Sequence, residues 1–259
     1  MCRWLNIPRS SYYYQAVDPV SEADLEDKIT YIFLESKSRY GARKIKKCLE
    51  KDGIILSRRR IRRIMKRLNL VSVYQKAAFK PHSKGKNEAP IPNRLDRQFD
   101  QERPLEVLVT DLTYVRVDRR WAYVCLIIDL FNREIIGLSV GWHKTAELVK
   151  QAIQSIPYAL TNVKLFHSDR GKEFDNQLID EMLEAFGITR SLSQAGCPYD
   201  NAVAESTYRS FKLEFINQET FQSLEELALK TKDYVHWWNY HRIHGSLNYQ
   251  TPMTKRIIA

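Results

Sequence analysis

The 259-residue sequence predicts an α/β protein with a mixed five-stranded sheet and flanking helices, preceded by a small all-α domain. Three observations lead to this fold class. Helical periodicity recurs between residues 21 and 68, and three strand-like apolar stretches joined by short links follow between residues 107 and 140. From residue 145 onward, helical and strand-like segments alternate. Strands that first follow one another directly and then alternate with helices indicate a sheet with both antiparallel and parallel pairs.

We expect residues 1–20 to form a separate N-terminal segment, because Pro8 and Pro19 interrupt any long element. Its aromatic cluster, Ser10–Tyr14, could stack on bases, but packing against another element is the more common role of aromatic residues. From Ser21 a first helix is predicted with Leu25, Ile29, Ile32 and Phe33 on one stripe. A second helix carries Ile45, Cys48 and Leu49, and a third, capped by Ser57, carries Ile61, Ile64, Met65 and Leu68.

The third helix has an apolar stripe and an otherwise basic surface. Its basic residues are Arg58, Arg59, Arg60, Arg62, Arg63, Lys66 and Arg67. This pattern is typical of a recognition helix, and we predict that residues 21–75 form a helix-turn-helix domain that binds DNA through these side chains. The alternative is a merely solvated basic face. Residues 37–86 hold 18 basic and 2 acidic side chains, a density that favours an anionic partner. Residues 76–103 are predicted to be an extended basic linker.

Composition agrees with a nucleic-acid-binding protein that contains a second, less charged domain. Of the net charge of +10, residues 1–100 hold 23 Lys and Arg against 11 Asp and Glu, whereas residues 101–259 hold 18 against 20. The sequence shows no apolar run long enough to cross a membrane and no signal-peptide pattern, so we expect a cytoplasmic, nucleoid-associated protein. The four cysteines form no Cys-x-x-Cys pair, which argues against a zinc site or a disulfide framework.

Residues 104–259 are predicted to form the second, α/β domain. Strands are expected at 107–115, 121–128 and 133–140, then a helix at 145–160, a strand at 163–167, a helix at 176–186 and a strand at 188–193. A further helix should follow, capped by Tyr199 or Asp200 and carrying Glu205 in its first turns. The first and fourth strands should be neighbours in the sheet.

Three acids in this domain need a partner. Asp111 lies inside the first strand, Asp169 follows the fourth, and 35 residues separate Asp169 from Glu205. A half-buried carboxylate costs several kcal/mol unless it is paired, and an Arg or Lys partner is the ordinary solution. No basic partner is evident for these three. Mg²⁺ or Mn²⁺ is the alternative, because hard cations take carboxylate oxygens, and two such ions support phosphoryl displacement.

The motifs of this chain resemble those of Asp-Asp-Glu transposases and retroviral-type integrases, and in particular the second reading-frame product of the insertion-sequence-three family. The matching stretches, in order, are Thr110–Tyr114, Asp129–Gly137, His167–Gly171, Tyr199–Ser206 and Trp238–Leu247, followed by Thr251 and Pro252. They cover most of the chain from about residue 20 to the end. Five matches in the same order are improbable by chance.

The resemblance implies a ribonuclease-H-like catalytic core in which Asp111, Asp169 and Glu205 hold two Mg²⁺ or Mn²⁺ ions. It implies a DNA transposase that binds the terminal inverted repeats of its element, hydrolyses the DNA to free a 3′ hydroxyl and joins this hydroxyl to a target phosphodiester. Lys212 stands at a family position that touches DNA. A homo-oligomeric synaptic complex is also implied, and an upstream-encoded portion, separate or fused by frameshifting, could be a further partner.

Other residues and functions remain open at this point. Asp118 and Asp129 suit turns or ion pairs, and Glu214 should point away from Glu205. His167 has no assigned role, and the histidines of the tail, together with Asn239 and Arg242, fit a packed helix better than a metal site, although the tail could contact DNA. The chain could instead be a DNA-binding regulator with a degenerate core, or a nuclease acting on RNA–DNA hybrids.

Overall fold

The computed structural model of the chain describes residues 4, 8, 21–74 and 91–259. Contacts between Cα atoms divide the chain into two compact units, Met1–Ser72 and Val73–Ala259. The predicted aromatic segment within residues 1–20 lies outside the described residues, apart from residues 4 and 8. Most of the predicted basic linker, with Lys76, Lys80, Lys84 and Lys86, also lies outside them.

The first unit contains the three predicted helices, α2 (Glu22–Glu35), α3 (Ala42–Lys51) and α4 (Arg58–Arg67). The hydroxyl of Ser21 accepts the N–H of Asp24, and the hydroxyl of Ser57 accepts the N–H of Arg60, so both predicted N-caps are formed. The apolar stripes of the three helices face one another and are buried, with Leu25, Ile29, Ile45, Leu49, Ile61 and Ile64 at most 2% exposed. Their burial supplies the stability that such short helices lack on their own.

The second unit is built on a five-stranded sheet of the order β3-β2-β1-β4-β5. Its strands are β1 (Val107–Val117), β2 (Arg120–Asp129), β3 (Ile135–Gly141), β4 (Leu165–Ser168) and β5 (Thr189–Leu192). The pairs β1–β2 and β2–β3 are antiparallel, whereas β1–β4 and β4–β5 are parallel. The predicted mixed sheet is therefore confirmed, with its first and fourth strands adjacent, and the architecture is ribonuclease-H-like.

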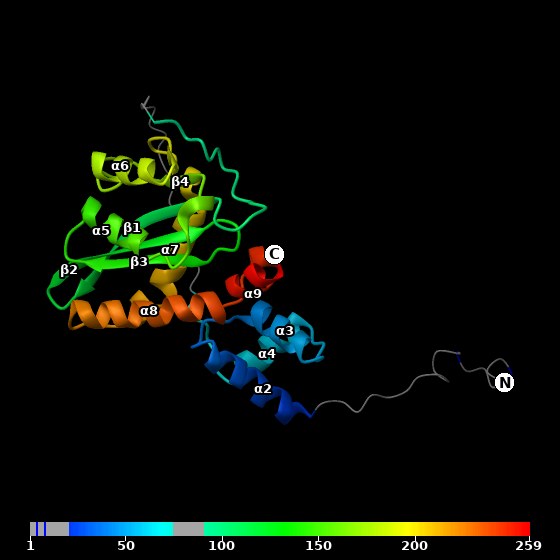
Figure 1. Cartoon of the computed structure of the whole chain (residues 1–259). Coiled ribbons are helices and arrows are strands. Elements are labelled where there is room, and N and C mark those ends of the chain that lie inside the picture. The colour runs from blue at the N-terminus through cyan, green and yellow to red at the C-terminus, as the bar shows by residue number, and fades with distance from the viewer. Residues whose placement is uncertain (1–3, 5–7, 9–20, 75–90) are drawn as a thin grey trace. The chain divides into compact units, whose positions relative to one another are not determined.

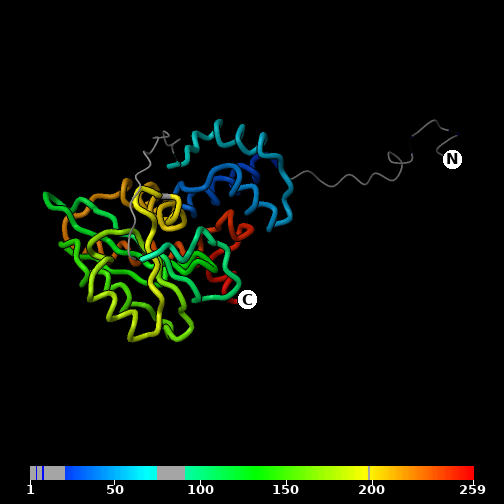
Figure 2. Tube along the Cα trace, turned by 90° about the horizontal axis from the view of Figure 1, so that it is seen from above, coloured from blue at the N-terminus to red at the C-terminus, as the bar shows by residue number. Residues whose placement is uncertain are grey.

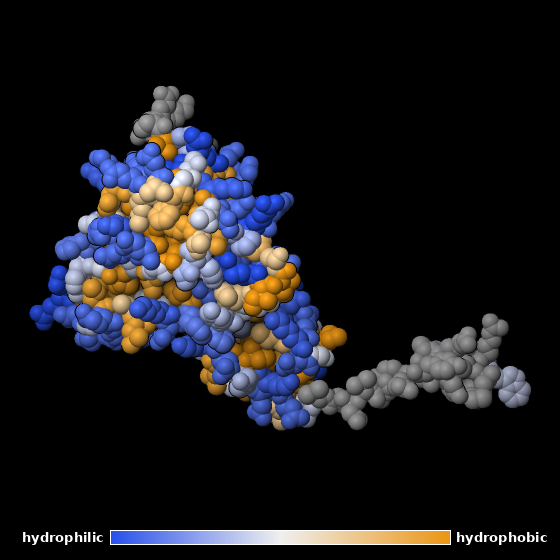
Figure 3. Space-filling model, viewed as in Figure 1, coloured by the Kyte–Doolittle hydropathy of each residue, from blue (hydrophilic) through white to orange (hydrophobic). Residues whose placement is uncertain are grey.

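Helices cover both faces of this sheet (Figure 1). On one face, α5 (Ala146–Gln154) and α6 (Gln177–Ala185) contribute Leu148, Val149, Ile179 and Leu183 to a core shared with strand residues such as Ile127. The other helices are α7 (Ala202–Glu214), α8 (Leu224–Tyr240), which lies against the opposite face, and α9 (Pro252–Ile258). Hydrophilic side chains cover most of the surface seen in Figure 3, with hydrophobic patches between them.

Two sequence-based expectations in this unit are wrong. The helix predicted at 145–160 ends at Gln154, because Pro157 disfavours helical conformation just before it. The helix that carries Glu205 is not capped by Tyr199 or Asp200. A 3₁₀ turn, Pro198–Asn201, precedes α7, and the Asp200 carboxylate accepts the N–H of Gln194 and the Nε–H of Arg97 instead. The Asp200 carboxylate therefore binds Gln194 and Arg97 and does not cap the N-terminus of α7.

The segment 91–106 runs along the outside of the second unit before it enters β1 (Figure 2). Its backbone is tied to the last strand of the sheet, because the N–H groups of Arg94 and Leu95 donate to the Ser191 hydroxyl at 2.9 and 3.2 Å. In the part of the chain that the structure describes, no helix is both long and apolar enough to span a bilayer.

Candidate active site

Asp111 and Asp169 meet at one edge of the sheet because of the strand register. The parallel pairing of β1 with β4 runs from Val107 opposite Leu165 to Val109 opposite His167. Asp111 and Asp169 each stand two residues beyond the last pair, where the two strands end their contact. Residues at the carboxyl ends of neighbouring parallel strands face the same crevice, so the two carboxylates come together as predicted.

Glu205 reaches the same crevice from the start of α7. Two side chains, Asn201 just before this helix and Tyr208 within it, form hydrogen bonds to the backbone around Asp111. The Asn201 side-chain Nδ2 donates to the Thr110 carbonyl at 2.9 Å. The Tyr208 hydroxyl donates to the Asp111 carbonyl and accepts the Leu126 N–H at 2.5 Å, so it bridges β1 and β2 at the Asp111–Leu126 pair. These contacts place Glu205 relative to Asp111.

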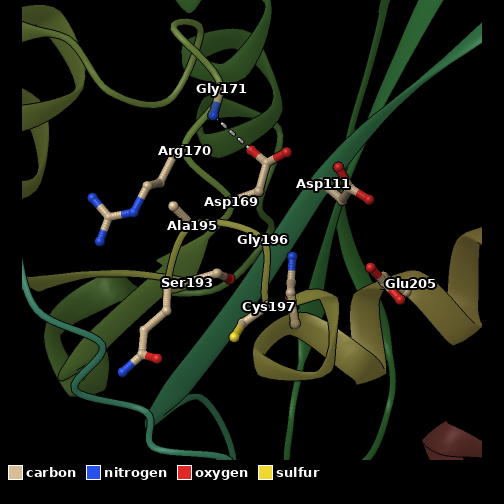
Figure 4. Close-up of a pocket in the computed structure, with 11 residues that line it drawn as sticks. Asp111, Asp169, Arg170, Gly171, Ser193, Ala195, Gly196, Cys197 and Glu205 are labelled. Atoms are coloured by element: carbon tan, nitrogen blue, oxygen red, sulfur yellow. Dashed lines mark hydrogen bonds between the residues drawn. The ribbon is translucent and has the colours of Figure 1, made fainter. Parts of the chain in front are cut away.

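The three carboxylates line a single cavity of about 430 Å³ (Figure 4). The rest of its wall comes from two loops and the turn before α7, namely Arg170, Gly171, Ser193, Gln194, Ala195, Gly196, Cys197 and Asn201. The side chains of Asp111, Asp169 and Glu205 come from a strand, a strand end and a helix, and they approach one another around this space. The structure thus brings together the three acids that the sequence singled out.

Main-chain donors fix the two aspartates. The Leu112 N–H donates to Asp111 Oδ1 at 2.7 Å, and the Gly171 N–H donates to Asp169 Oδ1 at 3.0 Å. Within the described residues, neither aspartate forms an ion pair with Lys or Arg. Burial raises the pKa of Asp111 to about 7, the Leu112 N–H opposes this rise, and the charges of Asp169 and Glu205 add to it. Burial also raises the pKa of Asp169. The acids are held together at an electrostatic cost that a cation would relieve.

Lys144 and Glu173 lie beside the site and were not predicted from the sequence. Lys144 Nζ is 2.8 Å from Glu173 Oε1, and the Glu173 side chain is buried. The Lys144 charge acts on both Asp111 and Asp169 and lowers their pKa values, against the larger effect of burial. A Cβ at position 171 would stand 2.3 Å from Glu173 Oε1, so a larger residue there would displace the Glu173 carboxylate from its present position. Glu173 belongs to the same short stretch as Asp169, whereas Lys144 lies outside every motif.

His167 is a packed, neutral residue behind the cavity. The Ser191 hydroxyl already accepts the N–H groups of Arg94 and Leu95, so its own proton goes to His167 Nδ1, 2.8 Å away. His167 Nε2 must then carry the ring proton and donate it to the Ser193 hydroxyl at 3.1 Å. Burial lowers the His167 pKa to about 4, in agreement with a neutral ring. His167 therefore fixes Ser193, which lines the cavity, and has no exposed face of its own.

Two of the other acids considered from the sequence, Asp129 and Glu214, have structural partners. Asp129 Oδ2 accepts the Leu105 N–H at 3.0 Å and pairs with Arg256 at 2.8 Å. Glu214 is buried away from the cavity, where it pairs with Arg242 at 2.8 Å and accepts the Tyr234 hydroxyl. Arg242 also contacts His244. The tail signature thus packs the end of the chain onto the core, and its histidines form no metal cluster among the described residues.

The basic residues of α4 fall into two groups. Arg60 pairs with Glu22 at 2.6 Å, and Arg67 pairs with Glu22 and Glu26, so both are joined to α2. The remaining residues, Arg58, Arg59, Arg62, Arg63 and Lys66, are exposed and form no ion pair within residues 21–74. In the second unit, Lys212 Nζ lies 4.6 Å from the centre of the Tyr114 ring. Among the residues of α4 predicted to bind DNA, these five side chains have no carboxylate partner within residues 21–74 that would neutralise their charge.

Comparisons with known proteins agree with both units. Family models described as "Integrase core domain" match residues 101–198 and 186–252, and one described as "HTH-like domain" matches residues 20–78. The InsK protein of insertion sequence element IS150 from Escherichia coli (strain K12) is 30% identical over 261 residues, covering 99% of this chain and 92% of that protein. The transposase for insertion sequence element IS904 from Lactococcus lactis subsp. lactis (strain IL1403) is 29% identical over 231 residues, covering 88% and 91%.

Transposase InsF for insertion sequence IS3A from Escherichia coli (strain K12) is 29% identical over 262 residues, covering 96% of this chain and 91% of that protein. These similarities extend over nearly the whole chain, across both the helical unit and the ribonuclease-H-like unit. The chain therefore belongs to the IS3 family of insertion-sequence transposases.

Proposed function

We propose that Asp111, Asp169 and Glu205 are the catalytic residues of this transposase and that they hold two Mg²⁺ or Mn²⁺ ions. One observation carries the proposal: three carboxylates from β1, the end of β4 and α7 line a single cavity, and main-chain N–H groups rather than basic side chains fix the two aspartates. The same observation argues against a regulator with a degenerate core, because nothing in such a protein requires three carboxylates to line one cavity, two of them buried without an ion pair to Lys or Arg in the described part of the chain.

The donor set fits hard cations. Oδ1 of each aspartate accepts a main-chain N–H, and Oδ2 of each has no hydrogen-bond donor within the described residues. Carboxylate oxygens are the ligands that Mg²⁺ and Mn²⁺ prefer. In the described part of the chain no three Asp, Glu, His or Cys side chains stand close enough to hold an ion as they are. Binding would therefore require these carboxylates to move closer together.

When bound, the ions would stabilise the attacking and leaving oxygens of an in-line phosphoryl displacement. The residues of the chain position the reaction. The Leu112 and Gly171 N–H groups keep one oxygen of each aspartate occupied, and thus orient the other. Asn201 and Tyr208 hold the helix of Glu205 against β1. The site would first cut DNA at an element end to free a 3′ hydroxyl, and then join this hydroxyl to a target phosphodiester.

We also propose that DNA binds the exposed cations of α4 and that Lys212 contacts DNA near the site. Guanidinium and ammonium groups without carboxylate partners are free to neutralise phosphates and release counterions. Arg60 and Arg67 would contribute less to DNA binding, because Glu22 and Glu26 already neutralise them. Cutting and joining two element ends would need a synaptic homo-oligomer, with an upstream-encoded portion as a further partner.

Cleavage and joining assays test the catalytic proposal. The substrate is a duplex that carries the terminal sequences of the element encoding the chain, incubated with Mg²⁺, Mn²⁺ or EDTA. We expect Asp111→Asn, Asp169→Asn and Glu205→Gln each to lower the cutting rate on the order of a thousandfold or more while DNA binding in EDTA is retained. Asp233→Asn, which removes an exposed carboxylate of α8, is the matched control. Cutting by Asp169→Asn at the wild-type rate would refute the assignment.

A further inference from the structure

One face of the β1–β2 hairpin exposes large aromatic side chains next to the site. Beyond the end of its pairing with β4, β1 continues with β2 alone (Figure 1), with Tyr114 opposite Tyr123 and Arg116 opposite Trp121. Residues directly opposite in an antiparallel pair share a face, so Tyr114, Arg116 and Trp121 stand together. The alternate residues Val115 and Ala122 face the core and are fully buried.

Tyr114 and Trp121 are 57% and 49% exposed, although aromatic residues of a folded unit usually bury. Their ring centres are 5.1 Å apart at an interplanar angle of 88°. Each ring has a cation on it: Lys212 Nζ is 4.6 Å from the centre of Tyr114, and Arg116 Cζ is 5.3 Å from the centre of Trp121. We call Tyr114, Trp121, Arg116 and Lys212 the aromatic–cationic surface.

The positive charge of the aromatic–cationic surface favours a nucleic acid over an apolar protein surface as its ligand. An apolar protein partner would require the Lys212 and Arg116 charges to be desolvated without compensation, which is costly. The adjoining hairpin turn adds Arg119 and Arg120 against a single Asp118, so the surroundings are also basic. Exposed aromatic rings flanked by cations suit a nucleic-acid strand, because the bases stack on the rings and the cations neutralise the phosphates.

We propose that the aromatic–cationic surface binds an unpaired nucleobase of the DNA substrate close to the point of cutting. Tyr114 lies three residues after Asp111 on the same strand, so the two side chains point to opposite faces of the sheet and are separated by about 10 Å along the strand, at roughly 3.3 Å per residue. This spans about three nucleotides at the helical rise of 3.4 Å per strand. Lys212 also belongs to α7, the helix that carries Glu205, so the surface and the site share two elements. The inference rests on the proposed function for its substrate, DNA.

The test separates stacking from general phosphate binding. The full chain is titrated in EDTA with two duplexes of the same sequence, one fully paired and one with three unpaired nucleotides at the end, carrying 2-aminopurine in the unpaired strand. We expect Trp121→Ala to weaken binding of the frayed duplex about tenfold or more and to abolish the quenching of 2-aminopurine, with little change for the paired duplex. Trp121→Phe should retain most of the binding.

Phe186→Ala is the matched control, because Phe186 is an aromatic side chain with the same 49% exposure on another part of the unit. Tyr114→Ala repeats the test if Trp121→Ala does not fold by circular dichroism. Equal losses on both duplexes, or no loss on either, would overturn the proposal. A change in sedimentation of DNA-free Trp121→Ala, with unchanged binding of the frayed duplex, would instead identify a contact between copies of the chain.

Because these titrations need no divalent metal, they are independent of the catalytic proposal. If the wild-type chain binds frayed DNA tightly and Asp169→Asn cuts element ends at the wild-type rate, the aromatic–cationic surface would stand and the catalytic assignment would be refuted. If Trp121→Ala cuts element ends at the wild-type rate and quenches 2-aminopurine as the wild type does, the catalytic assignment would stand and the proposal for the aromatic–cationic surface would be refuted.

Discussion

Replacing Asp111 with Asn should stabilise the metal-free protein at alkaline pH. The Asp111 pKa lies at about 7 in the folded chain and at 3.8 in an unperturbed carboxyl. A difference of about 3 pH units, at about 1.36 kcal/mol each, corresponds to about 4 kcal/mol. Asn keeps an oxygen that can accept the Leu112 N–H, and it removes the charge that burial and the neighbouring acids disfavour.

The sign of the pH dependence follows from linkage. Below pH 3.8 the Asp111 carboxyl is protonated in both the folded and the unfolded chain, so it costs nothing. As the pH rises from about 4 to 7, the unfolded chain releases this proton first and the folded chain loses stability, up to the full amount above pH 7. Asp111→Asn lacks this loss. We expect the free energy of unfolding of Asp111→Asn to exceed that of the wild type by about 4 kcal/mol at pH 8 and about 2 kcal/mol at pH 5.

Thermal unfolding in EDTA at both pH values measures the effect. About 4 kcal/mol in a unit of this size corresponds to a rise in Tm on the order of 10 °C. Asp233→Asn should leave Tm unchanged at both pH values, because its carboxylate is exposed. Mn²⁺ should raise the Tm of the wild-type chain and leave that of Asp111→Asn almost unaltered. A variant no more stable than the wild type at pH 8, or an advantage equal at both pH values, would refute the reasoning.

Two further predictions concern basic residues. Arg62→Ala should weaken DNA binding and reduce the slope of log K against log salt by about 1, whereas Arg60→Ala, which only loses its pair with Glu22, should leave the slope nearly unchanged in the same titration. Arg242→Met should destabilise the second unit by about 3–5 kcal/mol in urea unfolding, because it leaves the buried Glu214 carboxylate uncompensated, and Glu214→Gln in the same chain should restore most of that loss. An unchanged urea midpoint in Arg242→Met would show that Glu214 finds another partner.

The sequence predicts the positions of Asp111 and Asp169 because they depend on strand period and on the order of strands, both of which are local or topological properties. The side-chain partners are less predictable. Lys144 reaches Glu173 from a different segment, and the carboxylate of Asp200 is taken by Arg97 from 103 residues away. Arg60 looks free in a helical pattern, yet α2 brings Glu22 against it. Such contacts depend on which surfaces face one another after folding, and no periodicity of a single segment contains that information.

The distribution of hydrogen bonds and ion pairs explains how the unit keeps three acids together. Each aspartate is positioned by a main-chain N–H, and Glu205 is positioned through the neutral side chains of Asn201 and Tyr208, which bind backbone groups around Asp111. An Arg or Lys in any of these roles would neutralise the charge that a cation needs. Buried ion pairs lie outside the cavity, where Arg242 pairs with Glu214 and Arg256 pairs with Asp129, and these pairs hold the C-terminal tail against the core. Tyr208 thus fixes the geometry of the site without lowering its negative charge, which is the arrangement that the proposed divalent cations would need.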